Sequence, residues 1–308
     1  MISVVIPVHN RERSVARSIE SVLKQTHADL EAVVIDDAST DETEKSVKNF
    51  DDPRIRYERL KKNCGVHMAR NRGLEISRGE FVVFFDSDDE LFPQALERMH
   101  AVFTDPKWGI VTAPYRLPDG NLTSFDLPDG EVNFEAYMCN KHMRPNKASL
   151  IMYRRSVLGD LRWFERNLDF VFCRRVAAQA KQYYIAEPLA AYHTQTGGTA
   201  DSMTLKRRTP NKALSISRAR IIADFADDFA PMLMKSCPRL YGYYAYGAAV
   251  GLLLAAETQK SRRFAYAAAR NQPRLQYVLF YIFSLMPGAG WILGLLFDAK
   301  SALMTSKT

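Results

Sequence analysis

The sequence has few cysteines, and their spacing predicts neither a disulfide framework nor a zinc site. Cys64, Cys139, Cys173 and Cys237 are far apart, without a C-x-x-C pair or a neighbouring histidine at zinc-binding spacing. These absences exclude the small disulfide-rich domains and the common structural zinc modules. The chain also has no basic leader and no apolar run of signal-peptide length after Met1. We therefore expect a protein of the reducing cytoplasm.

Glycine is missing from the segment that follows the first apolar run. Val8-His9-Asn10-Arg11 contains no glycine. A nucleotidyltransferase would place a glycine-rich phosphate loop with a lysine or arginine at this point. The absence disfavours that class of enzyme. The chain also shows no internal repeat and no low-complexity segment.

Length and composition are those of an ordinary globular protein. The chain has 308 residues, of which 47% are hydrophobic and 25% are charged, enough for one large domain or two smaller ones. The formal net charge of +7 fits an anionic ligand such as a nucleotide diphosphate, an anionic membrane surface, or good solubility. The charge by itself selects none of these.

Strand and helix patterns alternate in the N-terminal third of the chain. Residues 4–6 and 32–35 are β-branched or apolar runs ended by polar residues, as in buried parallel strands. Between them an apolar stripe at helical spacing predicts an amphipathic helix: Val15, Ile19, Val22 and Leu23. These three elements form one β-α-β unit.

The same alternation continues along the chain. Ser39 and Glu42 stand at capping-box spacing before a helix that carries Val47 and Phe50. Further elements are expected in this order: a strand over 55–59, a helix over 65–77 stopped by Gly79, a strand over 81–85, a helix over 93–103, a strand over 110–113, loops and short strands over 114–130, an ordered stretch over 149–153, a helix over 167–182 and the segment 183–193. The pattern predicts a mixed, mostly parallel sheet flanked by helices, with a helical C-terminal extension.

Polar clusters follow three of the predicted strands, where ligands bind in parallel sheets. They are His9-Asn10, Asp36-Asp37 and Asp86-Ser87-Asp88-Asp89. A carboxylate of the second cluster suits recognition of a nucleotide's base or ribose. The D-x-D spacing of the third presents hard oxygen ligands of the kind that Mg²⁺ or Mn²⁺ prefers. A metal there would bridge the carboxylates and a diphosphate.

Five motifs follow one another in the N-terminal third of the chain. They are Val4-Val5-Ile6-Pro7-Val8-His9-Asn10, Val34-Ile35-Asp36-Asp37-Ala38-Ser39-Thr40-Asp41, Asn63-Cys64-Gly65, Ala69-Arg70-Asn71-Arg72-Gly73, and Gly79-Glu80-Phe81 through Asp86-Ser87-Asp88-Asp89. Together and in this order they resemble the family 2 glycosyltransferases, which have the GT-A fold. The resemblance thins out after Pro93.

The resemblance implies a nucleotide-sugar site and a metal site. Asp37 matches the family's base-binding carboxylate, and Arg70 matches an arginine beside the nucleotide. Asp88 is the expected direct metal ligand, with Asp86 beside it. At His9 the family usually has tyrosine, so stacking on the base is expected to be weaker or replaced by a hydrogen bond. The implied donor-site residues are Pro7, His9, Asn10, Asp37, Arg70, Asp86 and Ser87.

An inverting transfer needs a general base for the acceptor hydroxyl, usually Asp or Glu. Asp169 is our candidate because Leu168-Asp169-Phe170 resembles the start of the family's Glu-Asp helix, although Leu168 replaces the glutamate; Glu165 is a rival.

Among the histidines, we expect three to be structural or exposed: His67, His100 and His142. His193 is either a residue that reaches the metal or, as we favour, an ordinary packed histidine.

The Q-x-x-R-W motif that processive members of the family often carry is absent from this sequence. Gln195-Thr196-Gly197-Gly198 resembles a flexible donor-closing loop instead, which favours transfer of a single sugar. The loop is expected to extend through four polar residues: Asp201, Lys206, Arg207 and Arg208.

The segment from Leu275 to Phe297 carries no charge and is close to the roughly 20 residues that a membrane-spanning helix needs. Pro287, Gly288 and Gly290 interrupt it, so a kinked, partly inserted or surface-lying segment is as plausible as a span. The neighbouring charges are basic and would be attracted to an anionic cytoplasmic leaflet. A buried helical hairpin or a dimer interface is the alternative.

The sequence thus predicts an inverting, non-processive, metal-dependent transferase of the hexosyltransferase type at the inner face of the cell membrane. Its expected partners are a nucleotide-diphosphate sugar, a glycan or lipid-linked acceptor, an anionic membrane surface and a second copy of the chain, but no nucleic acid. We expect residues 1–104 to form the nucleotide-sugar-binding half of one GT-A domain and residues 105–205 its acceptor-binding half, followed by a helical, basic and apolar C-terminal region over 206–308. A non-catalytic nucleotide-sugar-binding or membrane assembly partner is the rival from another class, disfavoured by the intact D-x-D pair.

Overall fold

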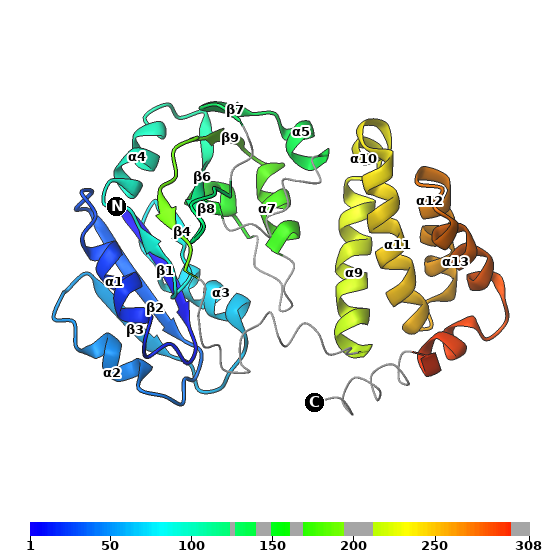
Figure 1. The fold of residues 1–308 in the computed structure, drawn as a ribbon, viewed down its shortest axis with the longest axis horizontal. Coiled ribbons are helices and arrows are strands. Elements are labelled where there is room, and N and C mark those ends of the chain that lie inside the picture. Colours follow the sequence, from blue (N-terminus) through cyan, green and yellow to red (C-terminus); the bar gives the residue numbers. More distant parts are fainter. Residues whose placement is uncertain (124–126, 140–148, 161–168, 194–211, 297–308) are drawn as a thin grey trace. The chain divides into compact units, whose positions relative to one another are not determined.

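The computed structural model divides the chain into two compact units, Met1–Gln195 and Thr196–Thr308 (Figure 1). The structure describes residues 1–123, 127–139, 149–160, 169–193 and 212–296. The two expected halves of the GT-A domain meet after residue 104, which lies inside the first unit. The domain boundary expected after residue 205 lies outside the described residues.

Four parallel strands form the first half of the sheet, in the order β3-β2-β1-β4. Both β1 and β2 are buried along their whole length, which explains their nearly continuous apolar sequences. The four strands confirm the expected runs, and their bounds are β1 (Ile2–Val8), β2 (Leu30–Asp36), β3 (Ile55–Arg59) and β4 (Phe81–Phe84).

The second half of the sheet contains antiparallel pairs, so the sheet is mixed, as expected. β8 lies antiparallel between β4 and β6, while β6 pairs in parallel with β9 and β10. The remaining strands of the described residues are β5 (Glu90–Leu91), β6 (Trp108–Arg116), β7 (Gly130–Val132), β8 (Ser149–Arg154), β9 (Lys181–Tyr184) and β10 (Ala190–Ala191).

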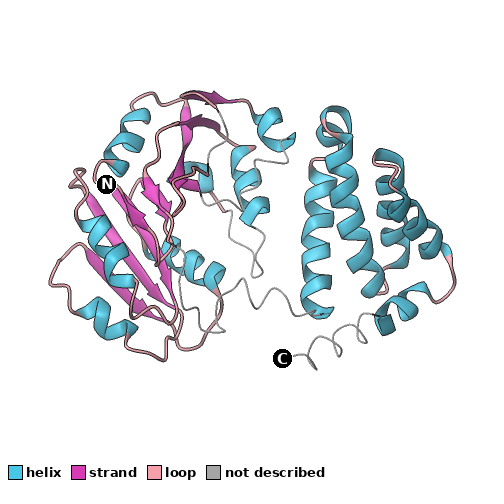
Figure 2. Ribbon diagram, in the orientation of Figure 1, coloured by secondary structure: helices cyan, strands magenta, loops and turns pink. Residues whose placement is uncertain are grey.

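Helices cover both faces of this sheet (Figure 2). One apolar cluster joins β1 to α1, α2 and α4, and a second, on the other face, joins β1 and β2 to α3 and α7. Successive strand residues point to opposite faces, so Val4 belongs to the first cluster and Val5 to the second. The helices are α1 (Val15–Leu23), α2 (Thr43–Lys48), α3 (Val66–Ile76), α4 (Ala95–Val102), α5 (Phe134–Cys139), α6 (Arg155–Leu158) and α7 (Asp169–Ala177).

The capping box expected at Ser39 and Glu42 is wrong. α2 begins at Thr43, so Glu42 itself occupies the N-cap position and makes no side-chain cap. Asp41 takes that part instead, because its Oδ1 accepts a hydrogen bond from the Thr43 amide at 3.0 Å. The Ser39 hydroxyl instead accepts a hydrogen bond from the amide of Asn10 at 3.0 Å, a tertiary contact that sequence spacing does not reveal.

Two other expectations also need correction. Gly79 is not the C-terminal stop of α3, which ends at Ile76 with Ser77 as an extended C-cap. A Cβ at Gly79 would lie 2.7 Å from the backbone nitrogen of Ser3, so glycine is needed for close passage beside β1. The helix expected to reach residue 182 ends at Ala177, because residues 181–184 pair with β6 as β9.

The described part of the second unit is helical. α11 contacts α9, α10 and α12, and α12 contacts α13. Residues 289–296 are also helical, after a break at Pro287 and Gly288, where Gly288 has a φ of 75°. The other helices are α9 (Lys212–Asp228), α10 (Ala230–Ser236), α11 (Pro238–Leu254), α12 (Thr258–Asn271) and α13 (Leu275–Leu285). Within residues 1–296, gaps excepted, no helix combines the length and apolarity that crossing a bilayer requires.

Two glycines of α11 provide a matched test of the α9–α11 contact. A Cβ at Gly251 would lie 2.2 Å from Ala219 Cβ, whereas Gly247 has nothing within 4 Å. We expect Gly251→Ala to lower the free energy of unfolding by about 1–3 kcal/mol through overpacking. Gly247→Ala should raise it by about 1 kcal/mol, because alanine favours helix. Urea unfolding followed by circular dichroism measures both, and equal midpoints would contradict the packing argument.

Candidate active site

Three polar segments follow the parallel strands β1, β2 and β4, and the sheet brings them to one edge. β1 pairs with both β2 and β4, and Val8 lies opposite Asp36 in the β1–β2 register. His9, Asp37 and Asp86 therefore leave the sheet at the same edge, in the position where α/β sheets bind ligands.

Asp37 is buried, and both of its carboxylate oxygens accept backbone hydrogen bonds. Oδ1 accepts from the amide of Cys64 and Oδ2 from the amide of Gly65, each at 2.7 Å. These contacts fix the entry to α3, where Gly65 has a φ of 91° that favours glycine. A carboxylate has about four acceptor positions, so Asp37 retains capacity for a ligand. Its expected contact with a base stays a prediction.

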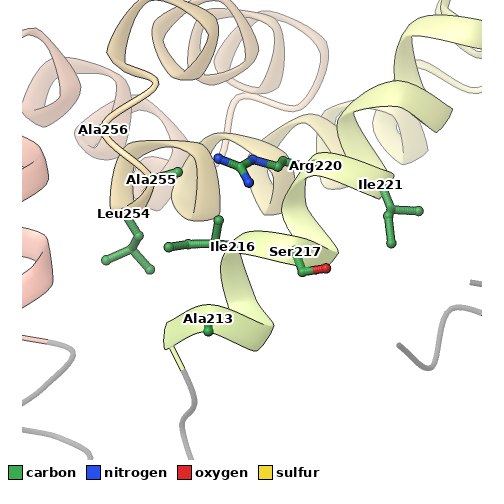
Figure 3. Close-up of a pocket in the computed structure, with 8 residues that line it drawn as sticks. All are labelled: Ala213, Ile216, Ser217, Arg220, Ile221, Leu254, Ala255 and Ala256. Atoms are coloured by element: carbon green, nitrogen blue, oxygen red, sulfur yellow. The ribbon is translucent and has the colours of Figure 1, made fainter. Parts of the chain in front are cut away.

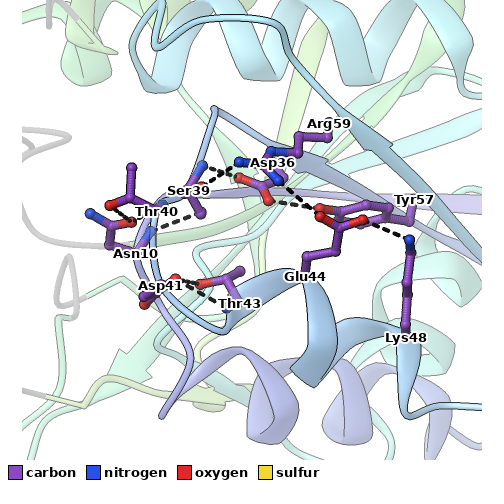
Figure 4. Close-up of polar contacts among 10 residues, drawn as sticks. All are labelled: Asn10, Asp36, Ser39, Thr40, Asp41, Thr43, Glu44, Lys48, Tyr57 and Arg59. Atoms are coloured by element: carbon purple, nitrogen blue, oxygen red, sulfur yellow. Dashed lines mark hydrogen bonds and ion pairs between the residues drawn. The ribbon is translucent and has the colours of Figure 1, made fainter.

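Asn10 and Asp36 hold the loops around this edge (Figure 4). The Oδ1 atom of Asn10 accepts a hydrogen bond from the amide of Thr40 at 2.8 Å. Asp36 accepts hydrogen bonds from the amide of Ser39 and the hydroxyl of Tyr57, both at 2.7 Å. Burial and the carboxylate of Asp36 raise the pKa of the Tyr57 hydroxyl. Asn10, at a φ of 52°, therefore organises the loop in addition to its expected contact with the donor.

Pro7 and His9 differ in what they can offer a ligand. Pro7 is buried inside β1, opposite Ile35 of β2. His9 is half-buried, and its Nδ1 atom is buried without a hydrogen-bond partner in the part of the chain that the structure describes. An imidazole nitrogen in that position can donate to or accept from a ligand.

The D-x-D segment leaves its carboxylates unequally exposed. The side chain of Asp86 is 49% exposed, and that of Asp88 is 26% exposed with its Oδ2 atom 3.9 Å from Nε of Arg11. Ser87, between them, is buried. Burial and the charge of Asp86 raise the pKa of Asp88, and burial together with Asp86 and Asp88 raises the pKa of Asp89 to about 9. The segment concentrates carboxyl groups whose ionised form a nearby cation would favour.

The donor set fits Mg²⁺ or Mn²⁺ as part of a larger complex. Within the described residues, no group of three or more His, Cys, Asp or Glu side chains is placed to hold a metal. Asp86 and Asp88 supply hard carboxylate oxygens, and Mg²⁺ usually takes only one or two carboxylates, with phosphates and water completing its shell. The two residues are therefore suited to a metal that arrives with a diphosphate.

Arg70 connects the D-x-D segment to the candidate base. Its side chain, 11% exposed, donates from Nη2 to Oδ1 of Asp86 at 2.8 Å, and its Nη1 lies 3.9 Å from Oδ1 of Asp169. Burial by itself lowers the pKa of the guanidinium, but the charges of Asp86 and Asp169 raise it overall. The structure therefore brings together Arg70, Asp86 and Asp169, residues that the sequence assigned to different roles.

His67, which we expected to be structural or exposed, lies in this cluster. It is buried, and its Nε2 atom lies 3.3 Å from Oδ1 of Asp169. The sequence feature that could have placed His67 in the site is its spacing from Arg70, because residues three apart lie on one face of α3.

His193 contacts Glu90 at 3.1 Å through Nε2, and its amide lies 3.4 Å from Oδ1 of Asp89.

Several expected features fall outside the described residues. They are Glu165, the rival base, the segment Gln195 to Gly198, and the residues Asp201, Lys206, Arg207 and Arg208.

A separate cleft of about 610 Å³ lies in the helical unit, between α9 and the end of α11 (Figure 3). It contains none of the expected site residues, and its one charged side chain, Arg220, is paired with Glu257 at 2.7 Å. Its lining residues are Ala213, Ile216, Ser217, Arg220, Ile221, Leu254, Ala255 and Ala256.

Comparison with known proteins agrees with the motifs. Residues 3–162 match the model of the family described as Glycosyl transferase family 2. The UDP-Glc:alpha-D-GlcNAc-diphosphoundecaprenol beta-1,3-glucosyltransferase WfgD of Escherichia coli is 34% identical over 121 residues, covering 39% of this chain and 48% of that protein. In eight of the relatives that the chain matches, the alignment covers between 14% and 54% of the relative's length.

Solved structures show the fold. TarS of S. aureus, in complex with UDP-GlcNAc, has a TM-score of 0.62 at 18% identity, covering 92% of this chain and 83% of that one. The mannosyltransferase PcManGT of Pyrobaculum calidifontis, in complex with GDP-Man and Mn²⁺, has a TM-score of 0.51 at 18% identity, covering 96% and 86%. These similarities confirm the expected GT-A type of fold, a mixed sheet flanked by helices with a helical C-terminal region.

The two backbone contacts of Asp37 generate a stability prediction. Asp37→Asn would place an amide NH₂ group against a backbone N–H, leaving one of these donors unsatisfied. We expect the free energy of unfolding to fall by about 1–3 kcal/mol. Asp51→Asn is the matched control, because Asp51 is exposed, and its effect should be within about 0.5 kcal/mol. Urea titration decides, and equal midpoints for the two variants would show that the contacts do not stabilise the loop.

Proposed function

Because this chain belongs to glycosyl transferase family 2, we propose that it moves one hexosyl group from a nucleotide-diphosphate sugar to an acceptor hydroxyl, with inversion. The observation that carries the proposal is the Arg70 guanidinium, which contacts Asp86 of the D-x-D segment and Asp169 at the start of α7. One cation, Arg70, thus lies beside both a carboxylate on the donor side and the candidate base. In a displacement reaction the first would be near the leaving diphosphate and the second near the attacking hydroxyl.

The donor would lie at the edge formed by the ends of β1, β2 and β4. Asp37 and the Nδ1 atom of His9 are the groups with hydrogen-bonding capacity for a base. Arg70 would hold the phosphates or the sugar beside Asp86. The solved structures of similar fold contain UDP-GlcNAc or GDP-Man, which supports a nucleotide sugar as the donor.

Asp88, with Asp86, would hold a Mg²⁺ or Mn²⁺ ion, and the bound ion would stabilise the negative charge of the departing diphosphate. The exposed carboxylate of Asp86 and the raised pKa of Asp88, caused by burial and by Asp86, support this assignment. The Mn²⁺ in the similar mannosyltransferase structure also supports it.

Asp169 would act as the general base. The acceptor oxygen attacks the anomeric carbon, the bond from that carbon to the diphosphate oxygen breaks, and the hydroxyl proton passes to the Asp169 carboxylate. Arg70 and His67 contact the same Oδ1 atom of Asp169, so they would orient the carboxylate and leave Oδ2 for the acceptor. Attack from the face opposite the leaving group inverts the anomeric configuration.

The acceptor that we propose is a lipid-linked or cell-surface glycan precursor at the inner face of the membrane. The name of the Escherichia coli relative, which specifies a diphosphoundecaprenol-linked sugar, supports this choice. A nucleotidyltransferase is disfavoured because His9-Asn10-Arg11, after β1, contains no glycine. A non-catalytic binding partner is disfavoured by the Asp86 and Asp88 pair. The proposal also includes a homodimer.

Carboxylate-to-amide variants test the two roles separately. We expect Asp169→Asn to lower the rate of glycosyl transfer about 100-fold or more while keeping the thermal shift produced by the preferred nucleotide sugar. Asp88→Asn should lose the part of that shift that Mn²⁺ adds and EDTA removes. Release of nucleoside diphosphate, measured with a panel of donors and extracted lipid-linked acceptors, reports the rate.

Asp160→Asn is the control for both variants, because Asp160 is exposed in the same unit, and it should behave as the unmodified protein. Unchanged transfer by Asp169→Asn would remove this residue as the base. Unchanged metal dependence in Asp88→Asn would remove the metal assignment and leave the base assignment intact.

A further inference from the structure

The helix α13 turns its aliphatic side toward solvent. Leu275, Leu279 and Ile282 are 74%, 55% and 54% exposed, whereas Tyr277 and Ser284 are 2% and 0% exposed. The three exposed residues recur at i, i+4 and i+7, so they form one stripe along the helix. A helix that packs on a core normally shows the reverse arrangement, with its aliphatic stripe buried.

Specific contacts fix α13 in this orientation. Tyr277 stacks on Tyr246 of α11, with ring centroids 4.4 Å apart and planes inclined by 22°. Arg262 of α12 donates from Nε to the carbonyl of Ser284 at 2.9 Å, and the Ser284 hydroxyl donates to the carbonyl of Tyr281 at 2.7 Å. Rotation of the stripe inward would break these contacts and expose Tyr277. The outward stripe is therefore a stable feature of the fold.

The exposed apolar surface continues past α13. Most of the large exposed hydrophobic side chains of the described residues lie in the last part of the chain. We call this set the C-terminal apolar surface; it consists of Leu275, Leu279, Ile282, Leu285, Met286, Trp291, Leu295 and Leu296. A concentration of large exposed apolar side chains in one segment of the chain favours an interaction site there.

The charges around this surface indicate what covers it. Every charged residue between Thr258 and Leu296 is basic. Arg270 and Arg274 are exposed beside the start of α13, and neither has an acidic partner among the described residues. A second copy docked symmetrically on this surface would bring these like charges together, which disfavours a dimer through this surface. Basic residues beside an aliphatic surface that carries a tryptophan match an anionic lipid interface.

We propose that the C-terminal apolar surface binds an anionic bilayer, with α13 lying in the plane of the membrane. Leu279 and Ile282 enter the boundary between headgroups and acyl chains, and Arg270 and Arg274 contact the anionic headgroups. α13 has 11 residues, too few to span a bilayer. The proposal goes beyond the transferase reaction and depends on none of its catalytic residues, so either one can fail alone.

Flotation of the full chain with vesicles tests the apolar part of the proposal. We expect the unmodified protein to float with vesicles of phosphatidylcholine and phosphatidylglycerol. Replacement of Leu279 and Ile282 together by glutamate should lower partitioning about 100-fold or more, because two aliphatic side chains no longer enter the bilayer. The matched control replaces Met234 and Tyr243, which are 45% and 51% exposed outside this surface, by glutamate and should float like the unmodified protein. Thermal unfolding checks that all variants are folded.

Substitution of Arg270 and Arg274 tests the electrostatic part of the proposal, with uncharged vesicles as the control. Arg270→Gln and Arg274→Gln should each weaken binding about five-fold on vesicles with phosphatidylglycerol, with little change on phosphatidylcholine alone. Flotation by the Leu279 and Ile282 variant equal to that of the unmodified protein would overturn the proposal. So would an unmodified protein that does not float but forms a dimer, with this variant monomeric, because the surface would then join two copies.

Discussion

The buried guanidinium of Arg70 is the constraint around which the first unit is arranged. A charge removed from water must be matched by an opposite charge and by hydrogen bonds. Asp86 and Asp169, which supply the opposite charges, come from the end of β4 and the start of α7, while Arg70 lies on α3. Neutralising one cation therefore holds three elements at the same edge of the sheet. The proposed donor-side carboxylate and the proposed base are positioned by the same contact.

The carboxylates around the site fall into two groups, which differ in how many hydrogen bonds they accept from the protein. Asp36, Asp37 and Asp41 accept hydrogen bonds from backbone amides, and these contacts shape the loops after β1 and β2. Asp86 and Asp88 receive less from the protein and remain partly exposed. Loops that are already ordered lower the entropic cost of binding a ligand. Asp86 and Asp88, which the loops do not use, are the carboxylates suited to a metal and a diphosphate.

Aliphatic side chains are buried in the first unit but exposed on α13 in the second. In the first unit, aliphatic residues of β1 and β2 are buried against helices on both faces of the sheet. In α13, aromatic and polar groups make the internal contacts, and leucine and isoleucine face outward. Burial of Tyr277 and of the Ser284 hydroxyl is enough to hold the helix, because both make specific contacts. The aliphatic stripe is then available for a surface outside the protein.

The sequence by itself determined the elements whose signals are local. Residues 4–6 and 32–35 are β-branched or apolar runs that favour buried strands, and the apolar stripe of α1 favours a helix on a core. Asp86 and Asp88 could be proposed as metal ligands from the sequence because a D-x-D pair directly after a buried strand is a local signal.

Tertiary structure decided everything that depends on contacts between distant residues. The Ser39 hydroxyl caps no helix because it binds the amide of Asn10, and residues 181–184 form a strand because β6 pairs with them. His67 joins the candidate base only because α3 and α7 pack on the same face of the sheet. The outward turn of α13 depends on Tyr246 and Arg262, which lie on other helices. Helical spacing predicts that a stripe exists, but the side it faces is set by what packs against the opposite side.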